Sequence, residues 1–201
     1  MRKPAPLLPL TVEVLREKAL AALARRALTK RDLTVVLTRA VDAWGRRAIR
    51  ASLEEATVKA SMERAREAIP AIVDRFVEVK LVDDAAFASA RTKRLSRAGR
   101  SRRAIEQHLG AHGIDGATAR DTVRRDAGDE LRAALVLARK KRLGPFRREG
   151  EDRKGRSPQE TGQKELASLA RAGFDFETAA RALRMPRERA LELLEGRGEF
   201  D

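Results

Sequence analysis

The chain has 201 residues, enough for one large domain or two small ones, and 42% of them are apolar, so a buried core can form. Aromatic residues make up only 3%, and Tyr and Cys are absent, which disfavours folds that stack bases on aromatic rings and excludes disulfides, thiolate nucleophiles and cysteine-ligated zinc. The net charge of +14 attracts nucleic acid, an anionic membrane or an acidic protein, although a solvated cationic surface accounts for it equally well.

The helix formers Ala, Leu, Arg and Glu dominate, and few segments alternate with a period of two, so we predict an all-α fold. Residues 1–10 contain Pro4, Pro6 and Pro9 and are expected to form a disordered tail. Their apolar run is too short for a signal peptide, and nothing in the chain approaches a membrane span. With the lack of cysteine, this favours a cytoplasmic protein without a membrane partner.

Two capping threonines organise the next part of the chain. Thr11 predicts a helix from Val12 to about Leu28, and Thr29 predicts a second helix. That second helix is expected to end before Gly45.

The segment 46–70 is charged and helix-prone. Its apolar residues Ile49, Leu53 and Ala56 form a sparse stripe. Pro70 is suited to the first turn of a helix, so we expect a new helix to begin there.

Asp83 is predicted to be the N-cap of a helix from Asp84 to about Ala98, with Val82 and Phe87 at the spacing of a hydrophobic staple. Asp84 then meets the positive end of the helix dipole. Adjacent carboxylates can also bind a metal, but side chains at neighbouring helix positions diverge and no companion ligand lies nearby. We therefore interpret the pair as a helix start.

Glycines and capping residues predict the following helices. Gly99 ends one helix, and Ser101 caps another that ends at Gly113. Asp115 or Thr118 begins the next one.

A leucine-rich helix is expected around residues 131–138. The segment 143–163 is rich in Gly, Pro and charge, which is typical of a mobile linker. Helices are predicted over 164–172 and 177–183, and Pro186 can begin a last short one.

The order of these elements contains internal similarity. The sequence GIDGATARDTV matches GFDFETAARAL: Gly113 and Gly173 each end a helix, and Asp115 and Asp175 each cap the next. Likewise TKRDLTVVL resembles SRRAIEQHL in its capping hydroxyl, basic pair and final leucine.

We therefore predict three copies of one three-helix unit, although amphipathic helices resemble one another in any protein. The copies are 11–81, with a charged insertion near 44–68, then 83–126, and then 129–195, interrupted by the linker 143–163.

Little in the sequence indicates catalysis. His108 and His112 have the i, i+4 spacing of a zinc pair, but the Glu of an H-E-x-x-H motif is missing, and cations near a helix C-terminus are common. Phosphate-loop, dinucleotide and nucleophile-elbow motifs are absent. We predict neither an enzyme nor a cofactor.

The densest charge cluster lies in residues 90–109. Its cations are Arg91, Lys93, Arg94, Arg97, Arg100, Arg102 and Arg103. Guanidinium groups match phosphate and carboxylate oxygens alike, so this segment is the candidate surface for a partner or DNA, with a solvated face as the alternative. Base reading by a helix-turn-helix is also conceivable, but the turn SRAGRS is longer than usual.

The block from residue 81 to residue 114 resembles the core motif of the RecX family of regulators. The matching residues are Leu81, Val82, Asp83, Asp84, Phe87, Ala88, Arg94, Gly99, Ser101, Arg103, Ile105, Leu109, Gly113 and Ile114. Residues 10–37 and 170–183 resemble the first and last repeats of the family. Arg100 departs from the second Gly usual in the family, and Lys80 from the Gly that often opens the motif.

This resemblance implies three tandem three-helix repeats in an elongated, curved body that acts as a monomer. It also implies a protein that binds the helical groove of the RecA filament and inhibits recombinase, ATPase and co-protease activity, modulating DNA repair and the SOS response. The alternative is a basic protein that binds single- or double-stranded DNA without sequence preference and without RecA.

Overall fold

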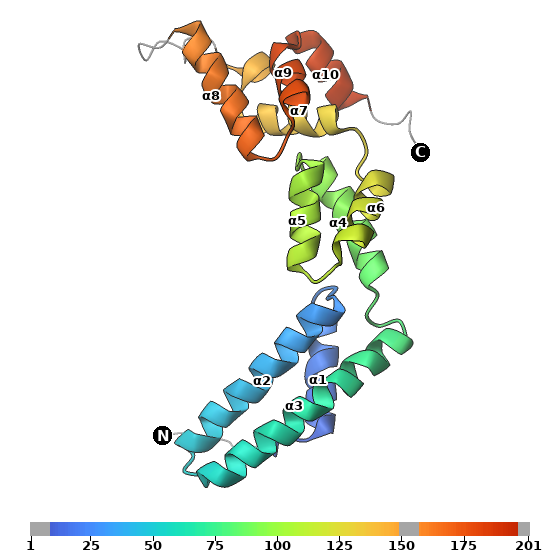
Figure 1. Cartoon of the computed structure of the whole chain (residues 1–201), viewed down its shortest axis with the longest axis vertical. Helices are drawn as coiled ribbons and strands as arrows, with labels where there is room; N and C mark the ends of the chain where they lie inside the picture. The colour runs from blue at the N-terminus through green and yellow to red at the C-terminus, as the bar shows by residue number, and fades with distance from the viewer. Residues whose placement is uncertain (1–8, 149–156, 197–201) are drawn as a thin grey trace. The chain divides into compact units, whose positions relative to one another are not determined.

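A computed structural model describes residues 9–148 and 157–196, and all regular structure in these ranges is helical, which confirms the all-α prediction (Figure 1). The helices are α1 (Val12–Leu23), α2 (Lys30–Arg50), α3 (Glu55–Glu78), α4 (Asp84–Arg97), α5 (Arg102–Ala111), α6 (Gly116–Asp126), α7 (Glu130–Lys141), the short 3₁₀ helix η1 (Gly144–Phe146), α8 (Pro158–Arg171), α9 (Phe176–Arg184) and α10 (Arg187–Glu195). They belong to two compact units, which divide between Phe87 and Ala88.

In the N-terminal unit, α2 and α3 are a long helical pair and α1 packs against both (Figure 1). The side chains of Thr11 and Thr29 accept hydrogen bonds from the N–H groups of Val14 and Asp32, as N-caps do. The buried core contains Leu15, Leu33, Leu37, Val41, Ile69, Ile72, Val73 and Phe76. Leu10, at the end of the predicted tail, is partly buried against this core, while residues 1–8 lie outside the described ranges.

The first helix is shorter than predicted. It ends at Leu23 instead of continuing to Leu28. Leu28 is only 3% exposed and packs into the core from the connection between α1 and α2. The chain leaves the helix before Leu28, so that Leu28 can be buried in the core and Thr29 can cap α2.

Gly45 does not end α2, as the sequence predicted, but lies inside it. A Cβ atom on Gly45 would lie 2.3 Å from Sδ of Met62 in α3. Glycine at position 45 therefore allows α2 and α3 to pack closely.

Pro70 likewise does not begin a helix, because α3 runs through it without interruption. Proline removes the hydrogen bond to the carbonyl four residues earlier, which belongs to Arg66. Both residues are exposed, so water can satisfy that carbonyl.

The predicted stripe in the segment 46–70 is wrong. Ile49 and Leu53 are 55% and 41% exposed, and Ala56 is exposed as well. The buried contacts of this region come instead from Trp44, Ala48 and Val58. The predicted stripe crosses the connection at residues 51–54 between α2 and α3, so its residues do not share the face of one helix.

The predicted helix starts in the middle of the chain are confirmed. The side chains of Asp83, Ser101 and Asp115 accept the N–H groups of Ala86, Ala104 and Thr118, at 2.9, 3.2 and 3.0 Å. Asp115, and not Thr118, is thus the cap of α6. The buried side chains of α4 to α6 and their turns include Phe87, Ala88, Ile105, Leu109, Ile114, Ala119 and Val123.

The C-terminal helices pack around α7 and α9, with α8 on one side and α10 on the other (Figure 1). The predicted linker 143–163 is too long. Phe146 is buried in η1, and α8 already begins at Pro158. Ser157 and Glu160 form a capping box there, a local signal that outweighs the polar composition. The remaining linker residues, 149–156, lie outside the described ranges.

Candidate partner-binding surface

The predicted basic cluster spans the end of α4, a turn and the start of α5. Most of its side chains are exposed, and Arg91 is partly buried. The exposed cations are Lys93, Arg94, Arg97, Arg100, Arg102 and Arg103.

The turn in this cluster is shaped by Gly99, which has a left-handed φ of +83°. A Cβ atom on Gly99 would lie 2.9 Å from Cγ1 of Val136 and 3.0 Å from the carbonyl oxygen of Ala133. The turn therefore packs tightly against α7. Arg100 follows directly and lies beside that helix.

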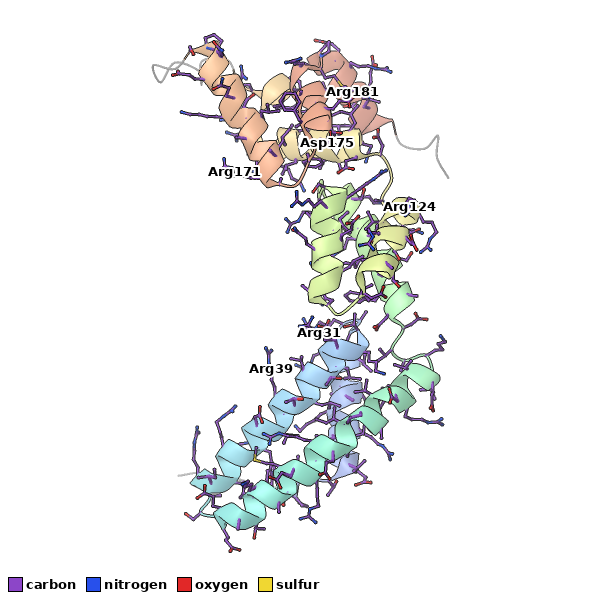
Figure 2. All side chains as sticks on the ribbon, viewed as in Figure 1. Arg31, Arg39, Arg124, Arg171, Asp175 and Arg181 are labelled. Atoms are coloured by element: carbon purple, nitrogen blue, oxygen red, sulfur yellow. The ribbon has the colours of Figure 1, made fainter. Side chains whose placement is uncertain are left out.

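Arg100 lines a groove with a volume of about 440 Å³, together with Gly99, Leu137, Lys141, Ser168, Arg171 and Ala172. We call it the basic groove, because its three charged residues, Arg100, Lys141 and Arg171, are all cations from different elements. Lys141 Nζ donates to Ser168 Oγ at 3.0 Å, and Arg171 lies at the end of α8 (Figure 2). A concave surface lined by cations and, among the described residues, by no carboxylate concentrates positive potential.

Sequence reasoning identified Arg100 but missed Lys141 and Arg171. Both are basic residues in the last turn of a helix, where cations favour the dipole, so each has an ordinary local explanation. Their convergence depends on the packing of α7 and α8, which no local pattern indicates.

Arg102 does not line the basic groove. Its guanidinium donates to the carbonyl of Gly128 at 3.0 Å and pairs with Glu130 at 3.4 Å, while its backbone N–H donates to Glu130 at 3.1 Å. Arg102 therefore holds the start of α5 against the start of α7.

Ser101 and Gly173, both predicted as structural motif residues, meet in space. Ser101 is completely buried, and its hydroxyl donates to the carbonyl of Ala172 at 2.7 Å. Gly173 has a φ of +92°, and a Cβ atom there would lie 2.6 Å from Ser101 Oγ. Close approach of these two turns thus requires glycine at position 173.

Three other predicted motif residues, Asp83, Asp115 and Asp175, act as helix caps, whereas Phe87 is buried. Hydrogen bonds from Ala86, Thr118 and Thr178 lower the pKa values of the Asp83, Asp115 and Asp175 carboxyl groups. Asp175 caps α9, and Gly113, with a φ of +87°, follows the end of α5. Asp84 has a further role, since it accepts the backbone N–H of Lys30 at 2.8 Å.

His108 and His112 lie close together on α5, with ring centroids 4.6 Å apart. Burial lowers the pKa of His108, and His112, Arg91, Arg100 and Arg94 lower it further. These surrounding cations oppose metal binding as well. Within the described ranges, no group of three or more His, Asp or Glu side chains is placed to hold a metal ion.

A second basic surface, missed by sequence reasoning, lies on α2 in the N-terminal unit. We call it the α2 stripe, formed by Arg31, Arg39, Arg46 and Arg50. These exposed residues follow helical spacing on the side opposite Leu33, Leu37 and Val41, over about 28 Å. Arg31 and Arg39 lie along this side of α2 in Figure 2. Asp42 shares the face but pairs with Arg66 at 2.7 Å.

Among residues 9–148 and 157–196, no helix combines the length and apolar composition needed to cross a bilayer. The described part of the chain thus forms a basic helical protein whose candidate site is a surface for binding, and whose acidic motif residues cap helices.

Comparisons with known proteins agree with this class. The family model described as RecX, second three-helix domain, matches residues 83–123. The regulatory protein RecX of Agrobacterium fabrum is 31% identical over 150 residues, covering 71% of this chain and 77% of the relative. The regulatory protein RecX of Myxococcus xanthus is 36% identical over 172 residues, covering 84% and 83%. The chain therefore belongs to the RecX family of regulatory proteins, which confirms the resemblance seen in the sequence.

Proposed function

We propose that this protein binds the RecA–DNA filament in its helical groove and lowers recombinase, ATPase and co-protease activity. It would thereby modulate DNA repair and the SOS response, in the cytoplasm where the filament forms, without catalysing a reaction. The observation that carries this proposal is the similarity to RecX regulatory proteins over most of the chain.

The basic groove supports this function, and we assign it the contact with the filament. Arg100, Lys141 and Arg171 lie around one concavity, and the motif segment 83–123 contributes Arg100. Such a surface is complementary to acidic side chains on a protein partner, and electrostatic complementarity sets orientation and association rate.

We also propose that α1–α3, α4–α6 and α7–α9 are three copies of one helical unit. The supporting observation is that the same contact occurs twice. The first residue of α4 (Asp84) and the first residue of α7 (Glu130) each accept the first N–H of an earlier helix, from Lys30 in α2 and Arg102 in α5. Repeated units of this kind suit a long, polymeric partner.

The proposal is tested by measuring RecA ATPase activity on single-stranded DNA with increasing amounts of the protein. The wild-type protein is expected to inhibit at amounts comparable to RecA. The triple variant Arg100→Glu, Lys141→Glu, Arg171→Glu should require at least about tenfold more protein, because like charges would face the acidic partner.

A matched control carries the same charge change elsewhere. Arg75, Arg124 and Arg189 are exposed and each pairs with a nearby residue of its own helix (Arg124, which pairs with Asp121, is labelled in Figure 2). Their replacement by Glu should leave inhibition within about twofold of wild type. Absence of inhibition by the wild-type protein at stoichiometric amounts would reject the function, and equal loss in both triple variants would reject the basic groove as the contact.

A further inference from the structure

A second concave site lies at the end of α7 and shares no lining residue with the basic groove. It is a pocket of about 760 Å³ lined by Arg142, Pro145, Phe146, Arg147, Arg148 and Arg187. We call it the arginine pocket. Four of its six lining residues are arginines, which come from the end of α7, the turn around η1 and the start of α10.

The backbone of this pocket is held in place by the helices beneath it. Arg142 has a left-handed φ of +56°, and the N–H of Leu143 donates to the carbonyl of Ala138 at 2.9 Å, which closes the end of α7. A Cβ atom on Gly144 would lie 2.7 Å from the carbonyl oxygen of Leu183 in α9. Phe146 is only 7% exposed and belongs to the core of this part of the chain. Arg142, Arg147 and Arg148 therefore project from a turn whose backbone packs against the helices, and Arg187 projects from the start of α10.

Arg147 is oriented by a buried acid. Glu165 in α8 is 7% exposed and accepts from Arg147 through both carboxylate oxygens, at 3.0 and 2.7 Å, and from the N–H of Gly144 at 3.2 Å. A bidentate pair of this kind fixes the plane of the guanidinium and offsets its charge.

The other three arginines are not offset in this way. Arg142, Arg148 and Arg187 are exposed, and none of them forms an ion pair among the described residues. Arg187 donates to the carbonyl of Pro145 at 3.4 Å, which directs it toward the turn. Within the described part of the chain, no acidic residue lines the pocket.

We propose that the arginine pocket binds phosphate groups of a nucleic-acid backbone. Several guanidinium groups that surround one small concavity suit a tetrahedral anion with several oxygens, and arginine forks bind phosphate through paired hydrogen bonds. Phe146, the aromatic residue of the pocket lining, is buried and leaves no surface on which bases could stack. Binding is therefore directed at the backbone and independent of base sequence.

This ligand does not depend on RecA, so the test uses the full chain and free nucleic acid. Fluorescence anisotropy of a short labelled single-stranded oligonucleotide gives the Kd at several salt concentrations. We compare wild type with the variant Arg142→Gly, Arg148→Gln, Arg187→Gln. Glycine at position 142 removes the charge and relaxes the left-handed backbone, so weaker binding cannot come from a strained turn.

The triple variant is expected to bind about tenfold more weakly, and the slope of log Kd against log salt should fall by about 0.7 for each phosphate group that the variant no longer binds. Arg189→Gln is the control on α10, because Arg189 lies outside the pocket and pairs with Glu192 at 2.8 Å. It should bind like wild type. The single variant Arg148→Gln changes an exposed residue outside the helices and should show part of the loss of binding. It tests the pocket even where the triple variant folds poorly.

Two results would overturn the proposal. One is an unchanged Kd and salt slope in the triple variant and in Arg148→Gln. The other is a loss of binding only for free pyrophosphate, measured by calorimetry, with oligonucleotide binding intact. In either case RecA inhibition by the wild-type protein would be unaffected, so failure here is distinct from failure of the proposed function.

Discussion

The starts of α2 and α5 are built from the same parts. Each begins with a completely buried hydroxyl cap, Thr29 or Ser101, which accepts the N–H three residues later at 3.1 or 3.2 Å. The first N–H of each helix, from Lys30 in α2 or Arg102 in α5, is accepted by the first residue of a later helix, Asp84 or Glu130. Each helix start thus satisfies its free N–H groups partly through a residue far away in the sequence.

The two starts differ in what surrounds the shared parts. Lys30 of α2 extends its side chain to Asp74 in α3, at 2.6 Å. Arg102 of α5 instead pairs with the same acid that accepts its N–H, Glu130, and with the carbonyl of Gly128. Glu130 therefore interacts with both the backbone N–H and the guanidinium of Arg102.

The start of α5 is also covered by the turn between α8 and α9. Ser101 donates to Ala172, and Gly173 leaves no room for a side chain beside the hydroxyl. In both places an Asp followed by another acid, at 83–84 and 129–130, begins a helix and also binds the start of an earlier helix. The two starts differ only in the contacts added around this common arrangement.

The largest loss of stability is expected when the contact between the start of α5 and the turn between α8 and α9 is disrupted. Gly173→Ala places a Cβ atom 2.6 Å from Ser101 Oγ and forces alanine to adopt a φ of +92°. Strain and overpacking together should lower the free energy of unfolding by about 2–4 kcal/mol. Urea unfolding followed by circular dichroism measures this change.

Gly110→Ala is the control for that substitution. Gly110 lies inside α5, and no heavy atom lies within 4 Å of the position of an added Cβ. Alanine there should raise the stability by about 0.5–1 kcal/mol, since it restricts the unfolded chain and favours the helix. If both substitutions change the stability in the same direction, the close approach of Gly173 and Ser101 is not what requires glycine.

The two acids should differ in their contribution to stability. Glu130→Ala removes an acceptor from the N–H of Arg102 and an ion pair at a side chain that is only 20% exposed, so we expect a loss of about 2 kcal/mol. Asp84→Ala removes the acceptor of the Lys30 N–H and should cost about 1 kcal/mol. Hydrogen exchange of the Arg102 and Lys30 amides gives a local measurement, and each should accelerate only in the variant that removes its own acceptor. Equal losses of stability in the two variants would show that the ion pair between Arg102 and Glu130 does not contribute to the free energy of unfolding.

The caps were predictable from sequence because capping is local. Asp83, Ser101 and Asp115 each accept an N–H within the next three residues, so a short segment carries the whole signal. The predictions failed where a residue's meaning depends on a partner helix. In the sequence, Gly45 resembles a glycine that ends a helix. Only the position of Met62 shows that glycine is needed there for the close packing of α2 against α3.

The candidate sites follow the same division. The cluster around Arg100 was visible as a run of charge, whereas Lys141 and Arg171 join it only through the packing of α7 and α8. The arginine pocket was hidden because its segment has the composition of a linker, and the residues that order it, Phe146 and Glu165, are separated by the segment 149–156. The predicted threefold repeat stays a prediction, to which the two acid contacts give physical support.

The smallest effect concerns the far end of α5, which differs from α2 in carrying a group that titrates near neutral pH. The last turn of α2 contains Arg47 and Arg50, whereas that of α5 contains His108. Burial and the neighbouring cations lower the pKa of His108 below its ordinary value of 6.5.

The unfolded chain then takes up a proton more readily than the folded one. The free energy of unfolding therefore falls as the pH decreases from 6.5 toward the lower pKa of the folded state, and this penalty is absent above 6.5. We expect the free energy of unfolding to decline as the pH falls below about 6.5, and His108→Gln to flatten this decline, because the pKa values of the capping carboxyl groups lie below 3.8. An equal decline in His108→Gln would assign the pH dependence to another group and leave α2 and α5 alike in this respect.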